Sequence, residues 1–238
     1  ESGHAPFSNL WESMMLFIWA TNVAYLFMEY KYKFKVIGMV VMAIESLGML
    51  SASLLPYKFT SVQRLNPALQ SKWHWMTDLL STWGLEKYAI GWLDFHVFTT
   101  FIGYAGFAIA FGLSILYLIK ERSEEKGSGG SLVNAFPPSR VLDEMSYRAI
   151  AWGFPFLGVG IVSGAVWANY AWGTYWSWDP KETWSLITWF IYAAYLHARV
   201  TRGWRGKRAA YISIAGFLAV IFLYWGVSFV LPGLHAYA

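Results

Sequence analysis

Six long apolar segments alternate with polar connections, and this alternation constrains the fold more than any other feature of the sequence. The segments span residues 10–29, 36–55, 95–119, 149–170, 183–199 and 209–231. A helix needs about 20 residues to cross the hydrocarbon core of a bilayer. Only 13% of the residues are charged, whereas about a quarter is usual in soluble domains. We therefore expect an all-α, polytopic membrane bundle with six transmembrane helices.

Basic residues are distributed unevenly over the polar connections. Of the 18 Lys and Arg residues, 13 lie in the connections after the first, third and fifth predicted helices. Cytoplasmic connections of membrane proteins are enriched in Lys and Arg. The distribution therefore predicts that the other connections and both ends of the chain lie outside the cytoplasm. The same rule accounts for the net charge of +4, so we expect no nucleic acid partner.

Three connections differ from the rest in length and composition. Residues 121–147 contain a Gly- and Ser-rich stretch and are expected to form a flexible cytoplasmic connection. Residues 56–94 form a long outer loop rich in aromatic residues, in which short interfacial helices are possible. Residues 167–183 form an outer Trp-rich loop. We expect one membrane domain over residues 1–238, with an upstream segment before it because the first residue is Glu.

Tryptophan is concentrated in one part of the chain, since 6 of the 15 Trp residues lie between residues 167 and 189. One explanation is an aromatic belt at the headgroup layer. A belt would mark both faces of the membrane, whereas this cluster lies in one outer loop around Gly173. The alternative is a binding surface for a large, flat, apolar ligand, formed by Trp172, Trp176 and Trp178.

The residues that follow these tryptophans have a structural interpretation. Asp179 is a favourable N-cap, Pro180 suits the first position of a helix, and Glu182 stands where the second member of a capping box is expected. We therefore predict that a helix begins here, whatever else the loop does.

Two of the five histidines are predicted to lie at the outer face that carries the Trp-rich loop. His96 opens the third predicted helix and His235 follows the sixth. Imidazole is a common axial ligand of heme iron, and two histidines that bracket one face could ligate one iron. Each of them, taken alone, also fits an interfacial histidine without a ligand role. His4 and His74 lie on the same side without a spacing that suggests ligation.

His197 stands apart from the other histidines. It follows Asp179 by 18 residues, which is about 27 Å along a helix axis, so it cannot serve the same iron. An ionisable residue near the inner end of a membrane helix is a functional candidate, which suggests an inner heme site. The alternative is a simple interfacial position beside Arg199.

The stretch Trp-Gly-Thr-Tyr-Trp-Ser-Trp-Asp-Pro-Lys-Glu at residues 172–182 resembles the Trp-rich signature of heme-handling membrane proteins. Its Asp-Pro-Lys-Glu ending is similar to the CcsA (ResC) family of cytochrome c biogenesis proteins. Residues 3–13, 66–71 and 231–237 resemble segments of that family in the same order. One departure is the insertion of residues 72–91 before Trp92-Leu-Asp-Phe-His96, where family members have almost no intervening chain.

The resemblance implies a set of roles. It implies heme b as the cofactor, with His96 and His235 as outer axial ligands and His197 at an inner heme site. It also implies contacts from the loop to the heme, through Trp172, Gly173, Trp176, Trp178 and Asp179. The membrane would be a bacterial plasma membrane or a thylakoid membrane.

The function implied by the resemblance is that of a heme-handling subunit of a holocytochrome c synthase, or heme lyase. Such a subunit presents the heme vinyl groups to the CxxCH motif of apocytochrome c, and the role includes moving heme across the membrane. A CcsB (ResB) membrane partner would supply the second ligand of the inner site. The chain has no cysteine, so thiol-reducing proteins and the substrate must supply all thiol chemistry.

Two other functions fit part of the pattern. A heme exporter or chaperone would pass heme to a separate ligase. A secondary transporter for an unrelated solute would contain inverted repeats or broken helices, and the sequence shows neither.

Overall fold

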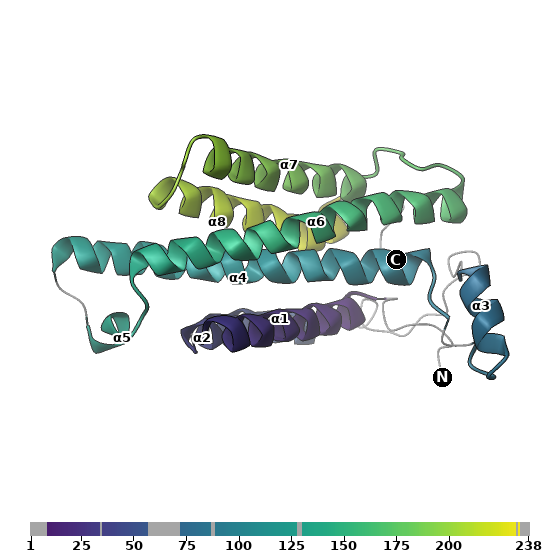
Figure 1. The fold of residues 1–238 in the computed structure, drawn as a ribbon. Coiled ribbons are helices and arrows are strands. Elements are labelled where there is room, and N and C mark those ends of the chain that lie inside the picture. Colours follow the sequence, from purple (N-terminus) through teal and green to yellow (C-terminus); the bar gives the residue numbers. More distant parts are fainter. Residues whose placement is uncertain are drawn as a thin grey trace.

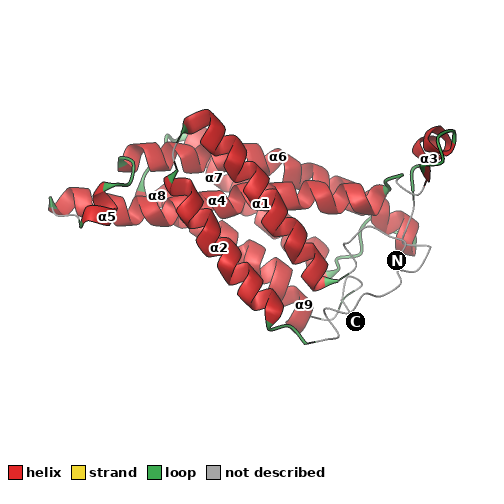
Figure 2. Cartoon of the chain, turned by 90° about the horizontal axis from the view of Figure 1, so that it is seen from below, coloured by secondary structure: helices red, strands yellow, loops and turns green. Residues whose placement is uncertain are grey.

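The computed structural model describes residues 9–33, 35–56, 72–86, 89–127, 130–231 and 233, which form an all-helical structure (Figure 2). Within these residues, extended backbone pairs at one isolated bridge, between Lys72 and Gly91.

Each of the six apolar segments coincides with one long helical element. These elements are α1 (Leu10–Tyr32), α2 (Val36–Ser53), α4 (Trp92–Lys126), α6 (Ser139–Trp172), α7 (Pro180–Thr201) and α8 (Lys207–Ile221), the last continued by η4 (Phe222–Gly226) and α9 (Val227–Val230). Two short helices, α3 (His74–Ser81) and α5 (Ser131–Asn134), lie in the connections. Among the described residues, α4, α6 and the continuous helix from Lys207 to Val230 are long and apolar enough to cross a membrane, and α2 is apolar but shorter.

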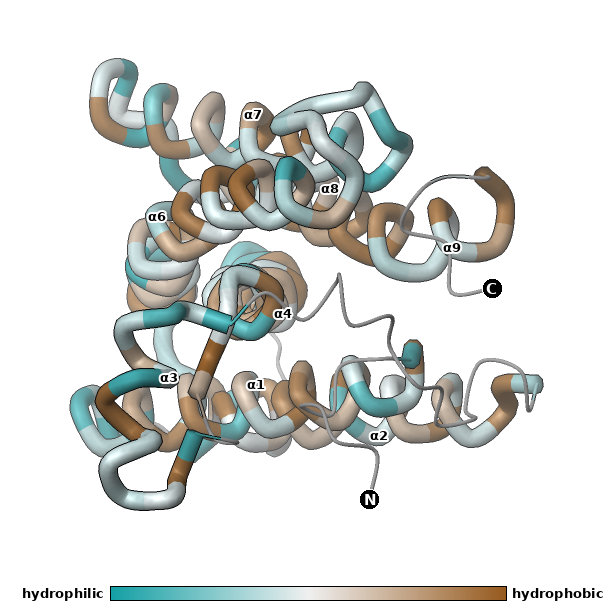
Figure 3. Tube along the Cα trace, turned by 90° about the vertical axis from the view of Figure 1, so that its right-hand side faces the viewer, coloured by the Kyte–Doolittle hydropathy of each residue, from teal (hydrophilic) through white to brown (hydrophobic). Residues whose placement is uncertain are grey.

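The long helices form three layers (Figures 1 and 3). The central layer contains α4 and α6, which make the most extensive contact in the molecule. Helices α1 and α2 cover one side of α4, and α7 and α8 cover the other side of the central pair. The bundle is therefore organised around α4.

Glycines allow α4 and α6 to approach closely. A Cβ atom on Gly103 would lie 2.9 Å from the backbone nitrogen of Leu157, and one on Gly106 would lie 2.9 Å from the carbonyl oxygen of Ala149. A Cβ atom on Gly153 would lie 2.8 Å from the Gly103 carbonyl oxygen. Small residues at such contacts are typical of helix pairs in membranes. They fix the register of α6 against α4.

Aromatic packing joins the central layer to α7, while many apolar side chains face outward. Tyr192 of α7 is fully buried and stacks on Phe107 of α4, with ring centroids 3.7 Å apart. Phe190 and Val162, in contrast, are more than half exposed. Large exposed apolar surface is unusual for a protein surrounded by water and suits a helical bundle in lipid.

The helices extend beyond the apolar segments at several ends. Helix α4 continues to Lys126, where Gly127 ends it with φ +60°, and α6 begins at Ser139. The connection predicted for residues 121–147 is therefore largely helical. Helix α6 also continues through Trp172 to Gly173, so Trp167 and Trp172 are helical residues and the non-helical loop is confined to residues 173–179. Good helix formers such as Lys, Glu and Arg account for the extension of α4, whereas the end of α6 lacks these charged residues.

The two ends of the bundle differ in chemistry. The three connections rich in Lys and Arg lie at the end that carries α5, here called the basic end (Figure 1). The loop between α6 and α7 lies at the opposite end with α3, here called the Trp-rich end.

A π-helical turn interrupts the last long helix. Within η4, the hydroxyl of Tyr224 donates a hydrogen bond to the carbonyl oxygen of Leu10 at 2.9 Å and lies 2.7 Å from Ser13 Oγ. These contacts hold the last long helix against the start of α1.

Candidate functional site at the Trp-rich end

His96 lies in the second turn of α4, and its ring is oriented by α6. Its Nδ1 atom is 2.6 Å from the carbonyl oxygen of Gly160. A carbonyl oxygen can only accept, so Nδ1 must carry the hydrogen, and in the neutral ring the lone pair is on Nε2. Metal-binding histidines in proteins are commonly oriented by a hydrogen bond of this kind from the other ring nitrogen.

Gly164, one turn after Gly160, makes room for the imidazole. A Cβ atom on Gly164 would lie 2.6 Å from both Cε1 and Nδ1 of His96. Real Cβ atoms essentially never come this close to another atom, so any larger residue would displace the ring. Two glycines spaced by four residues on α6 thus provide the carbonyl oxygen and the space that hold His96.

The tryptophans at the end of α6 connect His96 to the Trp-rich loop. The indole of Trp167 is buried and lies almost parallel to the His96 ring, with a centroid separation of 6.4 Å and an interplanar angle of 7°. Trp172 contacts Trp167 edge to face at 4.9 Å. His96, Trp167 and Trp172 therefore form one aromatic cluster that reaches the end of α6, where the non-helical loop begins.

The loop itself presents aromatic side chains outward. Trp176 and Trp178 pack edge to face, with centroids 5.8 Å apart. Trp178 has φ +60° and an exposed fraction of 69%, and Tyr175 is 60% exposed. A positive φ is uncommon for a bulky residue and requires support from its surroundings.

That support comes from the start of α7. Asp179 is the N-cap residue, Pro180 is the first helical residue, and the two members of the capping box are Asp179 and Glu182. Glu182 Oε2 accepts hydrogen bonds from the backbone N–H groups of Ser177 at 2.8 Å and Asp179 at 3.2 Å. Thr183 Oγ1 donates to the Trp178 carbonyl oxygen at 3.2 Å. The acidic cap therefore fixes the loop as well as the helix.

Lys181 adds a cation to the same turn, ahead of the apolar part of α7. Burial lowers its pKa to about 8, while the Asp179 carboxylate acts in the opposite direction. A lysine with such a pKa is partly neutral in weakly basic solution, so the charge of this turn depends on pH.

The end of the chain returns to this cap. Gly233 lies against Asp179 and Pro180 so closely that a Cβ atom on Gly233 would collide with the Asp179 carboxylate. His235, the second predicted outer ligand, follows two residues later and lies outside the described residues, as does His4. Sequence reasoning did not single out Gly233.

The inserted segment, residues 72–91, closes on itself. Lys72 pairs with Gly91, and Trp73 donates its backbone N–H to the Ile90 carbonyl oxygen at 3.0 Å. Trp73 also packs edge to face on Trp92, with ring centroids 5.4 Å apart. The two ends of the inserted segment, Lys72 and Gly91, therefore lie side by side at the start of α4. It contains α3, which begins at the exposed His74.

His197 does not belong to this cluster. It is exposed near the end of α7 at the basic end, whereas Tyr195 and Arg199 on the same helix are buried. The Arg199 guanidinium instead forms a buried ion pair with Asp143 of α6 at 2.8 Å. Sequence reasoning missed this pair, because it depends on how α6 and α7 pack.

The chain resembles proteins of one family over its whole length. A family model described as "Cytochrome C assembly protein" matches residues 86–235. The chain is 41% identical to the cytochrome c biogenesis protein CcsA of Guillardia theta, an alignment that covers 100% of this chain and 78% of that protein. Identity is 43% to CcsA of Prochlorococcus marinus (strain NATL2A), with coverage of 100% and 78%. It is 42% to CcsA of Chlamydomonas reinhardtii, of which the chain spans 62%.

Proposed function

The chain belongs to the cytochrome c assembly family, together with proteins named CcsA, and we propose that it is the heme-handling subunit of a cytochrome c synthase. Family membership shows a membrane protein of cytochrome c biogenesis. In our proposal, the Trp-rich end lies on the extracytoplasmic side of the membrane and holds heme b between His96 and His235. The chain then presents the heme vinyl groups to the CxxCH motif of apocytochrome c.

The hydrogen bond from His96 to Gly160 is the observation that carries this proposal. It fixes the tautomer in which Nε2 has the lone pair needed to bind iron. The space at Gly164 and the parallel ring of Trp167 hold the imidazole in one orientation. A histidine that served only as an interfacial residue would not need a ring so constrained on three sides.

The loop supports a flat apolar ligand at the same end. Trp178 and Tyr175 are exposed although they are large aromatic residues, and the capping interactions of Glu182 keep the loop in one conformation. Trp172, Trp176 and Asp179, with Gly173 at the bend, complete the surface that we propose contacts heme. Preorganised aromatic surface lowers the entropic cost of holding a ligand.

His235 completes the proposed ligand pair. Gly233 lies against Asp179, and two residues of extended chain span at most about 7 Å. The contact therefore places Gly233, two residues before His235, beside the loop, and this supports His235 as the second axial ligand in our proposal.

The main contribution of the chain to thioether formation is orientation. Each thioether forms when a thiol S–H adds across a vinyl C=C bond, which requires no oxidant. Heme supplies the vinyl groups and apocytochrome c supplies the thiols, while this chain holds the two in attack geometry. Thiol-reducing proteins keep the substrate cysteines reduced, since this chain has no cysteine.

An inner heme site at His197 would require a partner. His197 lies on the outward face of α7. Phe190, Ala194 and His197 are all exposed and follow one another at spacings of four and three residues, so they share this face. An exposed imidazole on this face supports a second ligand from a CcsB (ResB) partner. In our proposal, heme passes from this inner site toward the Trp-rich end.

The proposal can be tested with the full chain, co-expressed with a CcsB partner and an apocytochrome c in a host without cytochrome c maturation. We expect heme to co-purify with the chain and holocytochrome c to accumulate. His96→Ala should remove both, and added imidazole should partly restore the heme absorption. The control is His74→Ala, because His74 is exposed at the same end.

Retention of the heme spectrum by His96→Ala, with unchanged holocytochrome yield, would overturn the assignment. Heme binding without any thioether formation, unless a separate ligase is added, would instead favour the heme exporter or chaperone.

A further inference from the structure

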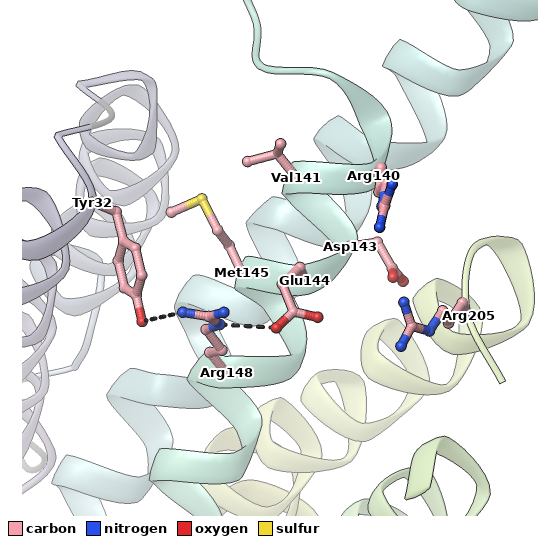
Figure 4. Close-up of a pocket in the computed structure, with 8 residues that line it drawn as sticks. All are labelled: Tyr32, Arg140, Val141, Asp143, Glu144, Met145, Arg148 and Arg205. Carbon is pink, nitrogen blue, oxygen red and sulfur yellow. Dashed lines mark hydrogen bonds and ion pairs between the residues drawn. The ribbon is translucent and has the colours of Figure 1, made fainter. Parts of the chain in front are cut away.

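A pocket of about 450 Å³ opens at the basic end, and Figure 4 shows the residues that line it. It lies between the end of α1, the start of α6 and the connection from α7 to α8. Its lining residues are Tyr32, Arg140, Val141, Asp143, Glu144, Met145, Arg148 and Arg205. Three arginines and two carboxylates thus share one cavity with two apolar side chains.

The two carboxylates are already neutralised by other groups. Asp143 pairs with the buried Arg199 at 2.8 Å and accepts the Gly206 backbone N–H at 3.0 Å. Glu144 pairs with Arg148 at 2.9 Å and with Arg199 at 3.4 Å. Both negative charges of the pocket are therefore compensated by Arg148 and Arg199.

Arg140 and Arg205 add two further positive charges to the pocket, and the charge of Arg205 also favours the ionised form of Glu144. Within the described part of the chain, neither forms an ion pair, and both are exposed. Figure 4 shows Arg140, from α6, and Arg205, from the α7–α8 connection, on either side of the Asp143 carboxylate. Two guanidinium groups from different elements provide paired N–H donors, which suit the oxygens of a phosphate.

An apolar stripe continues from the pocket along α6. Arg148 is followed on the same face by Trp152, Pro155, Val159 and Val162, at alternating spacings of four and three residues, and all are exposed. Val162 is 67% exposed and Trp152 is 40% exposed. The stripe leads away from the basic end toward the middle of the bundle.

We propose that this pocket binds the headgroup of an anionic phospholipid. The phosphate accepts hydrogen bonds from the exposed guanidinium groups of Arg140 and Arg205, and an acyl chain follows the stripe that begins at Trp152. Basic pockets between membrane helices are typical sites for acidic headgroups. A free anion would use the arginines but not the stripe, which is why we assign the pocket to a lipid.

The test compares the purified full chain in neutral detergent with added phosphatidylglycerol, phosphatidylcholine or inorganic phosphate. Phosphatidylglycerol should raise the melting temperature and remain bound in native mass spectrometry, whereas the other two should not. Replacing both Arg140→Gln and Arg205→Gln should weaken phosphatidylglycerol binding by about tenfold or more, since each arginine near a membrane surface contributes about 1 kcal/mol.

The matched control is the pair Arg122→Gln and Arg202→Gln, which removes the same charge from exposed positions at the same end without touching the pocket. Equal weakening in both double variants would overturn the proposal in favour of unspecific charge attraction. An equal shift from inorganic phosphate would identify a free-anion site instead. If the double variant fails to fold, Arg140→Gln alone should still weaken phosphatidylglycerol binding. The unmodified chain should in any case prefer phosphatidylglycerol to phosphatidylcholine, and the absence of both effects would overturn the proposal.

Discussion

The imidazole of His96, on α4, donates its Nδ1 hydrogen to the carbonyl oxygen of Gly160, on α6, at 2.6 Å, so a different helix decides which nitrogen of the ring has the lone pair. The proposed iron ligand therefore depends on the packing of α6 against α4 as much as on its own position in the sequence.

The first prediction concerns the space beside that ring. Gly164→Ala should displace the imidazole, because the new Cβ atom would lie 2.6 Å from two of its ring atoms. We expect a loss of about 1–3 kcal/mol in unfolding free energy and a loss of heme absorption although His96 is present. Gly158→Ala is the control on the same helix, where the nearest atom would be Trp189 Nε1 at 3.2 Å. Normal heme content in Gly164→Ala would contradict the proposed role of the ring.

The second prediction concerns the acidic cap. Glu182→Ala removes an acceptor shared by the backbone N–H groups of Ser177 and Asp179, so stability should fall by about 1–2 kcal/mol. The loop should also become sensitive to protease near Trp178. Ser185→Ala is the control, because its hydroxyl bonds only within α7 in the described structure. A loop equally resistant to protease in both variants would show that Glu182 does not hold it.

The third prediction concerns pH. Burial lowers the pKa of Lys181 to about 8, from the ordinary 10.5. Between these values the unfolded chain binds more protons than the folded chain, so stability should rise with pH across this window. The cost of burying the ammonium is complete below about pH 8. Lys181→Met should thus stabilise the protein near pH 7 by on the order of 1–2 kcal/mol, and by less near pH 10.

Lys207 should show the opposite dependence of stability on pH. Hydrogen bonding to Glu125 raises the pKa of Lys207, so its contribution to stability is present at lower pH and is lost as the pH rises. Lys207→Met should therefore change the pH slope of the melting temperature in the opposite direction to Lys181→Met. If Lys181→Met and Lys207→Met change the pH slope of the melting temperature in the same direction, the pKa of Lys181 is not lowered in the folded protein.

The fourth prediction concerns the buried ion pair at the basic end. Asp143→Leu leaves the Arg199 guanidinium buried without its main partner, which should cost about 3–5 kcal/mol. Adding Arg199→Leu should recover much of this loss, because two apolar residues can replace a buried pair. Lys207→Ala, which breaks the pairs of the exposed Lys207 with Glu121 and Glu125, should destabilise the protein far less than Asp143→Leu, because water screens exposed charges. Unfolding in mixed detergent measures the change in unfolding free energy for each of these variants.

The fifth prediction concerns the inserted segment. Because Lys72 and Gly91 are paired, residues 73–90 can be replaced by a two-residue Gly-Gly turn without moving the start of α4. The shortened chain should fold and keep its heme absorption, with a lower melting temperature because Trp73 no longer packs on Trp92. Loss of heme with a retained fold would show that the insertion contributes to the site.

The apolar segments predicted all six long helical elements, because length and hydrophobicity alone determine such helices. The Asp-Pro-Lys-Glu sequence likewise predicted the start of α7, since capping is a local property. The environment of His96 was not predictable in this way: Gly160 and Gly164 lie more than 60 residues away, and only the packing of the two helices brings them to the ring. The same reason hides the basic pocket, whose arginines come from separate elements.

The extent of α6 was also underestimated. The predicted helix ended at residue 170 and overlapped the predicted loop of residues 167–183, whereas α6 continues through Trp172 to Gly173, whose φ of +81° ends it. Trp167 consequently points into the bundle beside His96 instead of outward. Helical periodicity, when followed past the apolar segment, would have identified it.

The wide turn at residues 222–226 has a consequence for everything that follows it. A π-helical turn accommodates one residue more than an α-helical turn, and one residue corresponds to a rotation of about 100°. Loss of a single amino acid within η4 would therefore rotate the final stretch by nearly a third of a revolution about its axis. Tyr224 and Gly233 could then not both keep their present neighbours, so the length of this short stretch is as strictly constrained as the identity of any side chain in it.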